Sequence, residues 1–318
     1  MMKITVLDGG VLNPGDVDWS PIEKLGELTV YDATPPEKFA ERASDADIIL
    51  VNKTPVGKTE AEYLKKCKFV GELATGVNNL DLPALTAKNI VVSNTPAYGA
   101  SDVAEHVLAL LLELARNTRA HTESVLAGDW EKRGEWCYWI KTPLALHGLT
   151  LGIIGFGGIG QTLGKIANAM GMKILANSRK RDAKVDYPFQ YASVDEILAN
   201  SDVISLHCPL TPDTEKLINA ESLAKARPGL ILLNTARGGL VDEKAVADAL
   251  KSGKLAGYGA DVLSVEPPTA DNPLLSAPNA LITPHIAWAT RKARQKIIDI
   301  TADNIRAFQQ GEPLNKVN

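Results

Sequence analysis

Short apolar runs alternate with segments of helical spacing along the first part of the chain. The runs KITVLDG, ELTVYD, DIILVNK, FVGELATG and IVVSNTP predict buried strands. Between them, PPEKFAERASDA, KTEAEYLKKC and LDLPALTAKN have the spacing of helices. This alternation is typical of a parallel sheet with helices on both faces.

The same alternation begins again at residue 149. LTLGIIG, KILAN, DVISLHCP, LILLNTARG and LAGYGADVL predict further strands. QTLGKIANAM and SVDEILANS predict helices, and Ser193 with Glu196 forms a capping box at the start of the second. We therefore expect an α/β protein with two doubly wound parallel-sheet domains.

Two long amphipathic helices are expected over residues 101–120 and 289–311. They are natural connectors if the first domain is discontinuous, with residues 1–98 and 288–318 in one domain and 99–287 in the other. Residues 121–148 have little periodicity and are rich in Trp and Gly. A loop of this length in a compact protein is usually functional or an interface arm.

Composition and charge narrow the class of protein. The 318 residues are 45% hydrophobic and 23% charged, with a net charge of −4, as in an ordinary globular protein large enough for two cores. The chain has no long basic cluster that would indicate nucleic-acid binding. It also has no apolar run long enough to span a membrane. Three dispersed cysteines favour a reduced, cytoplasmic protein. No histidine pair has metal-ligand spacing, so we predict no metal.

A glycine-rich motif follows the strand LTLGIIG and opens a helix. Gly155, Gly157 and Gly160 form GxGxxG, in which the first glycine permits a tight turn, the second lets backbone approach a pyrophosphate, and the third allows close packing. A structural glycine turn is the alternative. We predict a dinucleotide site formed by the loop Gly155, Phe156, Gly157, Gly158, Ile159 and Gly160.

The residues after the strand KILAN bear on the choice of cofactor. An acidic residue at this place usually accepts from the ribose hydroxyls of NAD, but Ser178, Arg179 and Lys180 follow Asn177 here. Basic side chains suit a 2′-phosphate, which favours NADP(H). The alternative is a solvated basic turn with NAD(H) held by Ser178 or Asn177.

Three polar residues stand after later predicted strands: Arg237, Glu266 and His285. Strand ends of a doubly wound sheet meet at one edge, so these side chains could converge. Histidine can protonate the alkoxide formed by hydride attack on a ketone, a carboxylate can orient the imidazole, and arginine can grip a substrate carboxylate. Singly, each could instead be an ordinary surface or core residue.

Five longer motifs follow one another along the chain, and their order and spacing are informative as well as their residues. They are GIIGFGGIG, LHCPLTPDTEKLIN, LLNTARGGLVDEKAV, GADVLSVEPP and TPHIAWAT. With them the chain resembles the D-isomer-specific 2-hydroxyacid dehydrogenase family over essentially its full length, and within it the hydroxypyruvate reductases (glycerate dehydrogenases). The resemblance implies a flavodoxin-like substrate domain, a Rossmann cofactor domain and a homodimer embraced by the arm at about 121–148. It also implies reduction of a small 2-oxoacid, with hydroxypyruvate the best guess and glyoxylate second.

The resemblance further implies roles for individual residues. Arg237 would polarise the substrate, Glu266 would tune the histidine and His285 would be the acid/base, while Asp261 would hold the nicotinamide carboxamide. Further cofactor contacts are implied or expected at Val103, His207, Cys208, Pro209, Thr235 and Ala236. Substrate contacts are expected at Ala74, Thr75, Gly76, Trp139 and Trp288.

Two other interpretations remain open at this point. Some proteins that resemble this chain are NAD(H)-sensing corepressors, which would show a peptide-binding groove and extended tails. A dehydrogenase for another D-2-hydroxyacid, or for phosphonate, phosphite or formate, is the second. Formate dehydrogenases of this superfamily carry Gln where Glu266 stands, which makes that activity a poorer fit.

Overall fold

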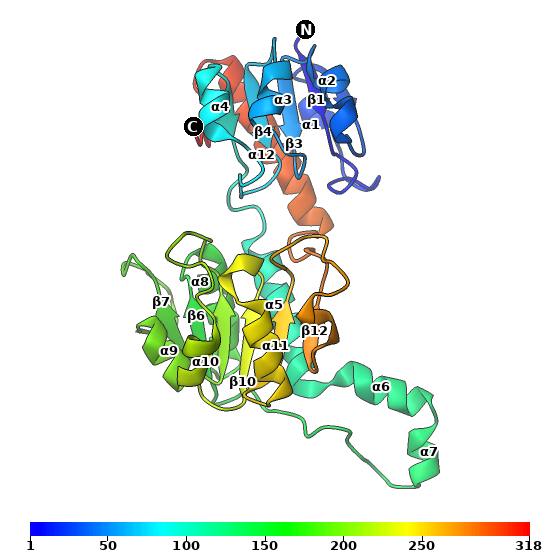
Figure 1. Ribbon diagram of the computed structural model, residues 1–318, viewed down its shortest axis with the longest axis vertical. Coiled ribbons are helices and arrows are strands. Elements are labelled where there is room, and N and C mark those ends of the chain that lie inside the picture. The colour runs from blue at the N-terminus through cyan, green and yellow to red at the C-terminus, as the bar shows by residue number, and fades with distance from the viewer. The chain divides into compact units, whose positions relative to one another are not determined.

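The computed structural model describes residues 1–318. The chain forms two compact units, the first from residues 1–99 and 288–318 and the second from residues 100–287 (Figure 1). Each unit has its own sheet and its own apolar core.

The first unit is built on five parallel strands in the order β2-β1-β3-β4-β5. The strands are β1 (Lys3–Val6), β2 (Glu27–Val30), β3 (Ile48–Val51), β4 (Phe69–Glu72) and β5 (Val91–Ser93). All residues of β3 and β4 are buried, because helices cover both faces of the sheet. This flavodoxin-like strand order confirms the expected doubly wound fold.

Helices of the first unit pack against both faces of its sheet. They are α1 (Ser20–Glu23), α2 (Pro36–Ala43), α3 (Lys58–Tyr63), α4 (Leu82–Ala87) and α12 (Arg291–Gln309). Side chains of α2, α3 and α4 join one apolar cluster, and those of α1 and α12 join the other. Thr290 caps α12 by accepting from the N–H of Ala293, so the predicted helix over 289–311 is correct to within two residues.

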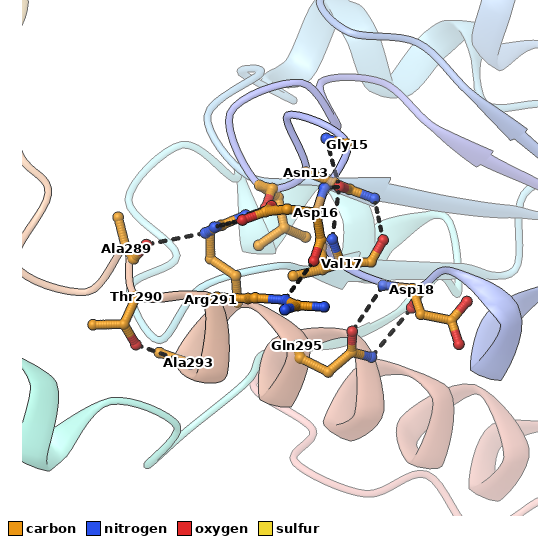
Figure 2. A network of polar contacts seen from close by, with 12 residues as sticks. Asn13, Gly15, Asp16, Val17, Asp18, Ala289, Thr290, Arg291, Ala293 and Gln295 are labelled. Carbon is orange, nitrogen blue, oxygen red and sulfur yellow. Dashed lines mark hydrogen bonds and ion pairs between the residues drawn. The ribbon is translucent and has the colours of Figure 1, made fainter.

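A polar network fastens the loop after β1 to the start of α12 (Figure 2). The Asn13 side chain accepts from three successive N–H groups, which closes the loop on itself. Arg294, only 7% exposed, makes a two-pronged contact with Asp16 at 2.6 Å for each nitrogen–oxygen pair. This charge-assisted contact lowers the pKa of Asp16. Gln295 accepts from the Asp18 N–H at 2.8 Å.

The second unit is built on seven parallel strands in the order β12-β11-β10-β9-β6-β7-β8. The strands are β6 (Thr150–Ile154), β7 (Lys173–Asn177), β8 (Gln190–Tyr191), β9 (Val203–Leu206), β10 (Leu230–Asn234), β11 (Leu255–Ala260) and β12 (Ala280–Ile282). The order in which the chain adds strands reverses between β6 and β9, as in the Rossmann fold, while all strands stay parallel. This confirms the second doubly wound domain.

Both faces of the second sheet are also covered. The helices are α5 (Ala100–Arg116), α8 (Gly158–Ala169), α9 (Val194–Asn200), α10 (Ala220–Lys225) and α11 (Glu243–Lys251), with short 3₁₀ turns η1 (Gly238–Leu240) and η2 (Pro273–Ser276). The predicted capping box is confirmed, since Ser193 Oγ accepts from the Glu196 N–H and the Ser193 N–H donates to the Glu196 carboxylate.

The predicted helix over residues 101–120 is wrong in its last turn. Helix α5 ends at Arg116, because Asn117 has φ +50°, a left-handed conformation that asparagine tolerates and that interrupts a helix. Two further helices follow, α6 (Thr118–Leu126) and α7 (Asp129–Arg133), and neither contributes a buried side chain. No helix of the protein combines the length and apolar character required to cross a membrane.

Candidate active site

The predicted site residues of the second unit follow the carboxyl ends of its parallel strands. The glycine loop follows β6, His207 follows β9, Arg237 follows β10, Asp261 follows β11 and His285 follows β12. In such sheets the ligand site lies outside these strand ends. The topology therefore places residues far apart in the sequence at one edge of the sheet.

The glycine loop has the geometry that the motif predicts. Gly155 has φ +100°, and a Cβ there would lie 2.4 Å from the carbonyl carbon of His207. A Cβ on Gly160 would lie 2.4 Å from the carbonyl oxygen of Gly155, so the helix needs glycine to pack closely. At Gly157, the N-cap of α8, a Cβ would meet nothing within 4 Å. The open backbone at a helix N-terminus fits a pyrophosphate.

Phe156 contributes to this loop differently from its glycines. Its side chain is 3% exposed and packs against Phe189, with 4.9 Å between the ring centroids. A contact between Phe156 and a cofactor would therefore come from its backbone.

The first four residues after β7, Ser178 to Arg181, carry no carboxylate. The Asn177 side chain donates to the carbonyl of Ala192 at 2.9 Å, which engages it within the fold. Ser178 is half-buried, and Arg179 and Lys180 are exposed. Two cationic side chains thus stand at the place where a carboxylate would select NAD.

His207 is a hydrogen-bonded and largely enclosed side chain. Its Nε2 lies 2.8 Å from Ser205 Oγ, and burial lowers the pKa of His207 to about 4. The imidazole is therefore neutral near pH 7 and has no charge with which to attract a phosphate. Burial raises the pKa of the neighbouring Cys208 thiol, whereas Pro209 is exposed. Cofactor contacts at these three residues remain predictions.

His285 and Glu266 are in direct contact. The imidazole Nδ1 lies 2.6 Å from Glu266 Oε2, and the other carboxylate oxygen accepts from the N–H of Leu263 at 2.9 Å. Against an ionised Glu266, Nδ1 is the protonated nitrogen. His285 has φ +56°, uncommon for a residue other than glycine. The structure thus joins two of the three predicted catalytic residues.

Asp261 holds the segment that carries His285, a role that sequence reasoning missed. Its carboxylate is 1% exposed and accepts from Thr283 Oγ1 at 2.6 Å and from the N–H groups of Ile286 and Ala287 at 2.8 and 2.7 Å. Bonds on both sides of the histidine support its left-handed backbone. The sequence did contain a signal for this structural role, because an acidic residue stands directly after the apolar strand β11.

Helix α5 carries two residues that bear on this arrangement, His106 and Val103. His106, on α5, has its Nε2 2.9 Å from Thr283 Oγ1, so the helix is tied to the segment that Asp261 holds. Val103 lies one turn earlier on the same helix and is half-buried. The expected contact of Val103 with a nicotinamide remains a prediction.

Arg237 directly precedes η1 and is half-buried. Its Nη1 donates to the carbonyl of Ala236 at 2.6 Å, and its own carbonyl accepts from the fully buried Asn234 side chain at 2.9 Å. Asn234 also accepts from the Ala236 N–H at 3.1 Å. Asn234 therefore shapes the turn that carries Arg237 and, next to it, Thr235.

The predicted substrate loop belongs to the first unit and follows β4. The Thr75 hydroxyl donates to the carbonyl of Thr95 at 3.0 Å, and the Ala74 carbonyl accepts from the Thr95 N–H at 3.0 Å. The N–H groups of Ala74, Thr75 and Gly76 donate to no protein group. The loop is therefore anchored through its carbonyl and hydroxyl groups while its backbone donors are available to an anion.

The two predicted aromatic substrate contacts differ in burial. Trp288 is 7% exposed and packs edge-on against Tyr98 in the core of the first unit. Trp139 is 61% exposed. Their roles toward a substrate remain predictions.

Known proteins resemble this chain over its whole length. Residues 108–287 match the model of the D-isomer specific 2-hydroxyacid dehydrogenase NAD-binding domain. A hydroxypyruvate reductase of Blautia hydrogenotrophica is 47% identical, with all of both chains covered, and a glycerate dehydrogenase of Methylorubrum extorquens is 42% identical over 92% of each chain. An acyclic imino acid reductase solved in complex with NADPH and D-Arg has a TM-score of 0.83 and 31% identity, with both chains fully covered.

The glycine loop, the imidazole–carboxylate pair and these matches define the class of protein. The chain belongs to the D-isomer specific 2-hydroxyacid dehydrogenase family and is an oxidoreductase with an NAD-binding domain.

Proposed function

We propose that this oxidoreductase reduces hydroxypyruvate to D-glycerate, with glyoxylate as a second substrate. The contact between His285 and Glu266 carries the chemical part of this proposal, because it orients a proton donor at the same edge of the sheet as the glycine loop. The likeness to a hydroxypyruvate reductase and a glycerate dehydrogenase supports the choice of substrate.

The bound nicotinamide supplies the hydride in this reaction. His285 Nε2 gives its proton to the ketone oxygen as that oxygen gains negative charge, and Glu266 stabilises the cationic imidazole that carries this proton. Arg237 polarises the ketone and binds the substrate carboxylate. For the first unit, we propose that the N–H groups of Ala74, Thr75 and Gly76 can donate to a substrate carboxylate.

The test is a panel of 2-oxoacids with wild-type protein and two variants. His285→Ala should lower kcat at least about 100-fold, since general acid–base catalysis has this usual scale. Glu221→Ala is the control, because that exposed side chain lies on α10 outside the proposed site. Turnover of His285→Ala near the wild-type rate would refute the mechanism, and a wild type inactive on hydroxypyruvate and glyoxylate would refute the substrate.

We further propose that the cofactor is NADP(H) rather than NAD(H). The support is the pair of exposed cations Arg179 and Lys180 and the absence of a carboxylate at the end of β7. Replacing Arg179 by Ala should weaken NADPH binding far more than NADH binding, whereas Arg306→Ala, an exposed arginine on α12, should change neither. Equal losses for the two nucleotides would reject a contact with the 2′-phosphate.

We also propose a homodimer assembled through the arm at about residues 121–148. Its support is the concentration of exposed apolar side chains there: Val125, Leu126, Trp130, Trp136, Trp139, Ile140 and Leu144. Exposed aromatic residues of this kind are typical interface anchors. Sedimentation should give twice the chain mass for wild type and a shift toward monomer for Trp136→Glu.

The free thiols Cys67, Cys137 and Cys208 support a reducing, cytoplasmic location.

A further inference from the structure

Buried polar side chains gather beneath the loop after β4 in the first unit. Asp8, Asn52 and Glu72 follow or end β1, β3 and β4 and are 8%, 3% and 0% exposed. Parallel strands place these three residues at one edge of the sheet. The Asp8 carboxylate is satisfied by three N–H groups of residues 52–54 at 2.6–2.8 Å.

Glu72 is not satisfied in the same way. Its Oε2 accepts from the Asn79 side chain at 2.9 Å, but its Oε1 is buried with no hydrogen-bond partner. The Oδ1 of Asn52, one residue beyond the sheet partner of Glu72, is also a buried acceptor with no donor. An ionised carboxylate in this position would leave a charged oxygen both desolvated and without a donor, which is strongly unfavourable.

The charges that face Glu72 come from Asp8, which opposes ionisation, and from the exposed Lys53, which favours it. Burial is the largest influence and raises the pKa of Glu72 to about 9. Glu72 is therefore a neutral carboxylic acid at pH 7 that can donate from one oxygen.

The Glu72 side chain connects the two ends of the proposed substrate loop. Glu72 is the last residue of β4, where the loop begins, and its bond to Asn79 reaches the far end of the loop. The Asn52 side chain donates to the carbonyl of Leu73 at 2.8 Å, so the first residue of the loop is tied to the same cluster. A negative charge on Glu72 would belong to a residue only two positions before Ala74, the first of the N–H groups that are proposed to bind an anion.

We propose that Glu72 is a positioning residue that must be protonated for the loop at Ala74–Gly76 to bind a carboxylate substrate. This inference rests on the proposed function of the loop. Loss of the proton would introduce charge repulsion against an anionic substrate, although the bond from Asn79 itself favours the ionised form of Glu72. The enzyme would then lose affinity for its anionic substrate at alkaline pH, with kcat less affected than KM.

The test measures KM for D-glycerate between pH 7.5 and 10 at saturating oxidised cofactor. The oxidation direction is used because the catalytic imidazole then acts as a proton acceptor, and alkaline pH favours that form. Wild-type KM should rise about tenfold by pH 10, as one ionisation near pH 9 requires. In Glu72→Gln, which keeps a neutral group of the same shape, the rise should be less than about threefold.

Two further variants make the test specific. Glu62→Gln makes the same change at an exposed glutamate on α3 and should reproduce the wild-type profile. Lys53→Gln removes the cation that favours ionisation and should move the rise in KM to higher pH. This exposed substitution also tests the proposal if Glu72→Gln fails to fold.

The outcomes separate this inference from the proposed function. A wild-type KM that is independent of pH, or parallel profiles for Glu72→Gln and wild type, would overturn the role of Glu72 while leaving the enzyme activity in place. Absence of D-glycerate oxidation and of 2-oxoacid reduction by wild type at pH 7.5 would overturn the proposed function and this inference with it. Infrared spectra should also show a carboxylic-acid carbonyl band that disappears near pH 9 in wild type only.

Discussion

Replacement of Gly238 by alanine should impair catalysis although the glycine touches no reacting atom. Gly238 begins η1, immediately after Arg237. A Cβ there would lie 1.9 Å from the carbonyl carbon of Leu263 and 2.2 Å from the backbone nitrogen of Ser264. Neither contact can be relieved by a side-chain rotation, because both neighbours are main-chain atoms.

The size of the effect follows from these distances. Cβ atoms essentially never approach within 3.0 Å of other heavy atoms, so the two segments must separate by at least 1.1 Å. One segment carries Arg237, and the other carries the N–H of Leu263 that holds Glu266 against His285. A misplacement of about 1 Å costs about 100-fold in rate, and overpacking costs about 1–3 kcal/mol of stability. We therefore expect kcat/KM to fall about 100-fold.

The assay is hydroxypyruvate reduction followed by the absorbance of the reduced nicotinamide, with thermal unfolding of the same samples. Gly239→Ala is the matched control, because the atoms nearest its Cβ would belong to the Leu210 side chain, at 2.9 Å, and that chain can move. The control should lose less than about threefold in kcat/KM. A Gly238→Ala enzyme with wild-type kcat/KM and melting temperature would refute the reasoning.

Three further predictions concern other parts of the molecule. Gly157→Ala should unfold at the wild-type denaturant concentration, because its Cβ meets no protein atom. The same Cβ would face the pyrophosphate, so calorimetry should show NADPH binding at least about tenfold more weakly. Unchanged binding would contradict the fit of the loop. Glu72→Gln should be about 3 kcal/mol more stable than wild type at pH 7, because the folded wild type keeps a proton that the unfolded chain, with an ordinary pKa of 4.5, releases. Urea titrations should show wild-type stability falling as pH rises from about 4.5 to about 9, with this slope missing in the variant. Asp16→Asn should lower the urea midpoint at pH 7, because Arg294 loses its ionised partner. The difference in midpoint between variant and wild type should shrink as acid protonates Asp16 in the wild type. A difference that stays constant at all pH values would argue against the ion pair.

The sequence by itself determined the fold class and the cofactor motif. Apolar runs separated by helical segments predict buried parallel strands, because strand and helix periods are local properties of the chain. The capping box at Ser193 and the glycine loop at Gly155–Gly160 were readable for the same reason, since each depends on residues only a few positions apart. The break at Asn117 was missed, because no glycine or proline marks it in the sequence and one left-handed asparagine ends the helix.

Only the tertiary structure decided which distant side chains meet. The sequence offered Glu266 and His285 as separate candidates, and the fold brings their atoms to 2.6 Å. It also revealed that Asp261 holds the histidine segment and that Glu72 is wholly buried. Hydrogen-bond partners and burial depend on the packing of strands that are remote along the chain, and no local pattern of residues specifies that packing.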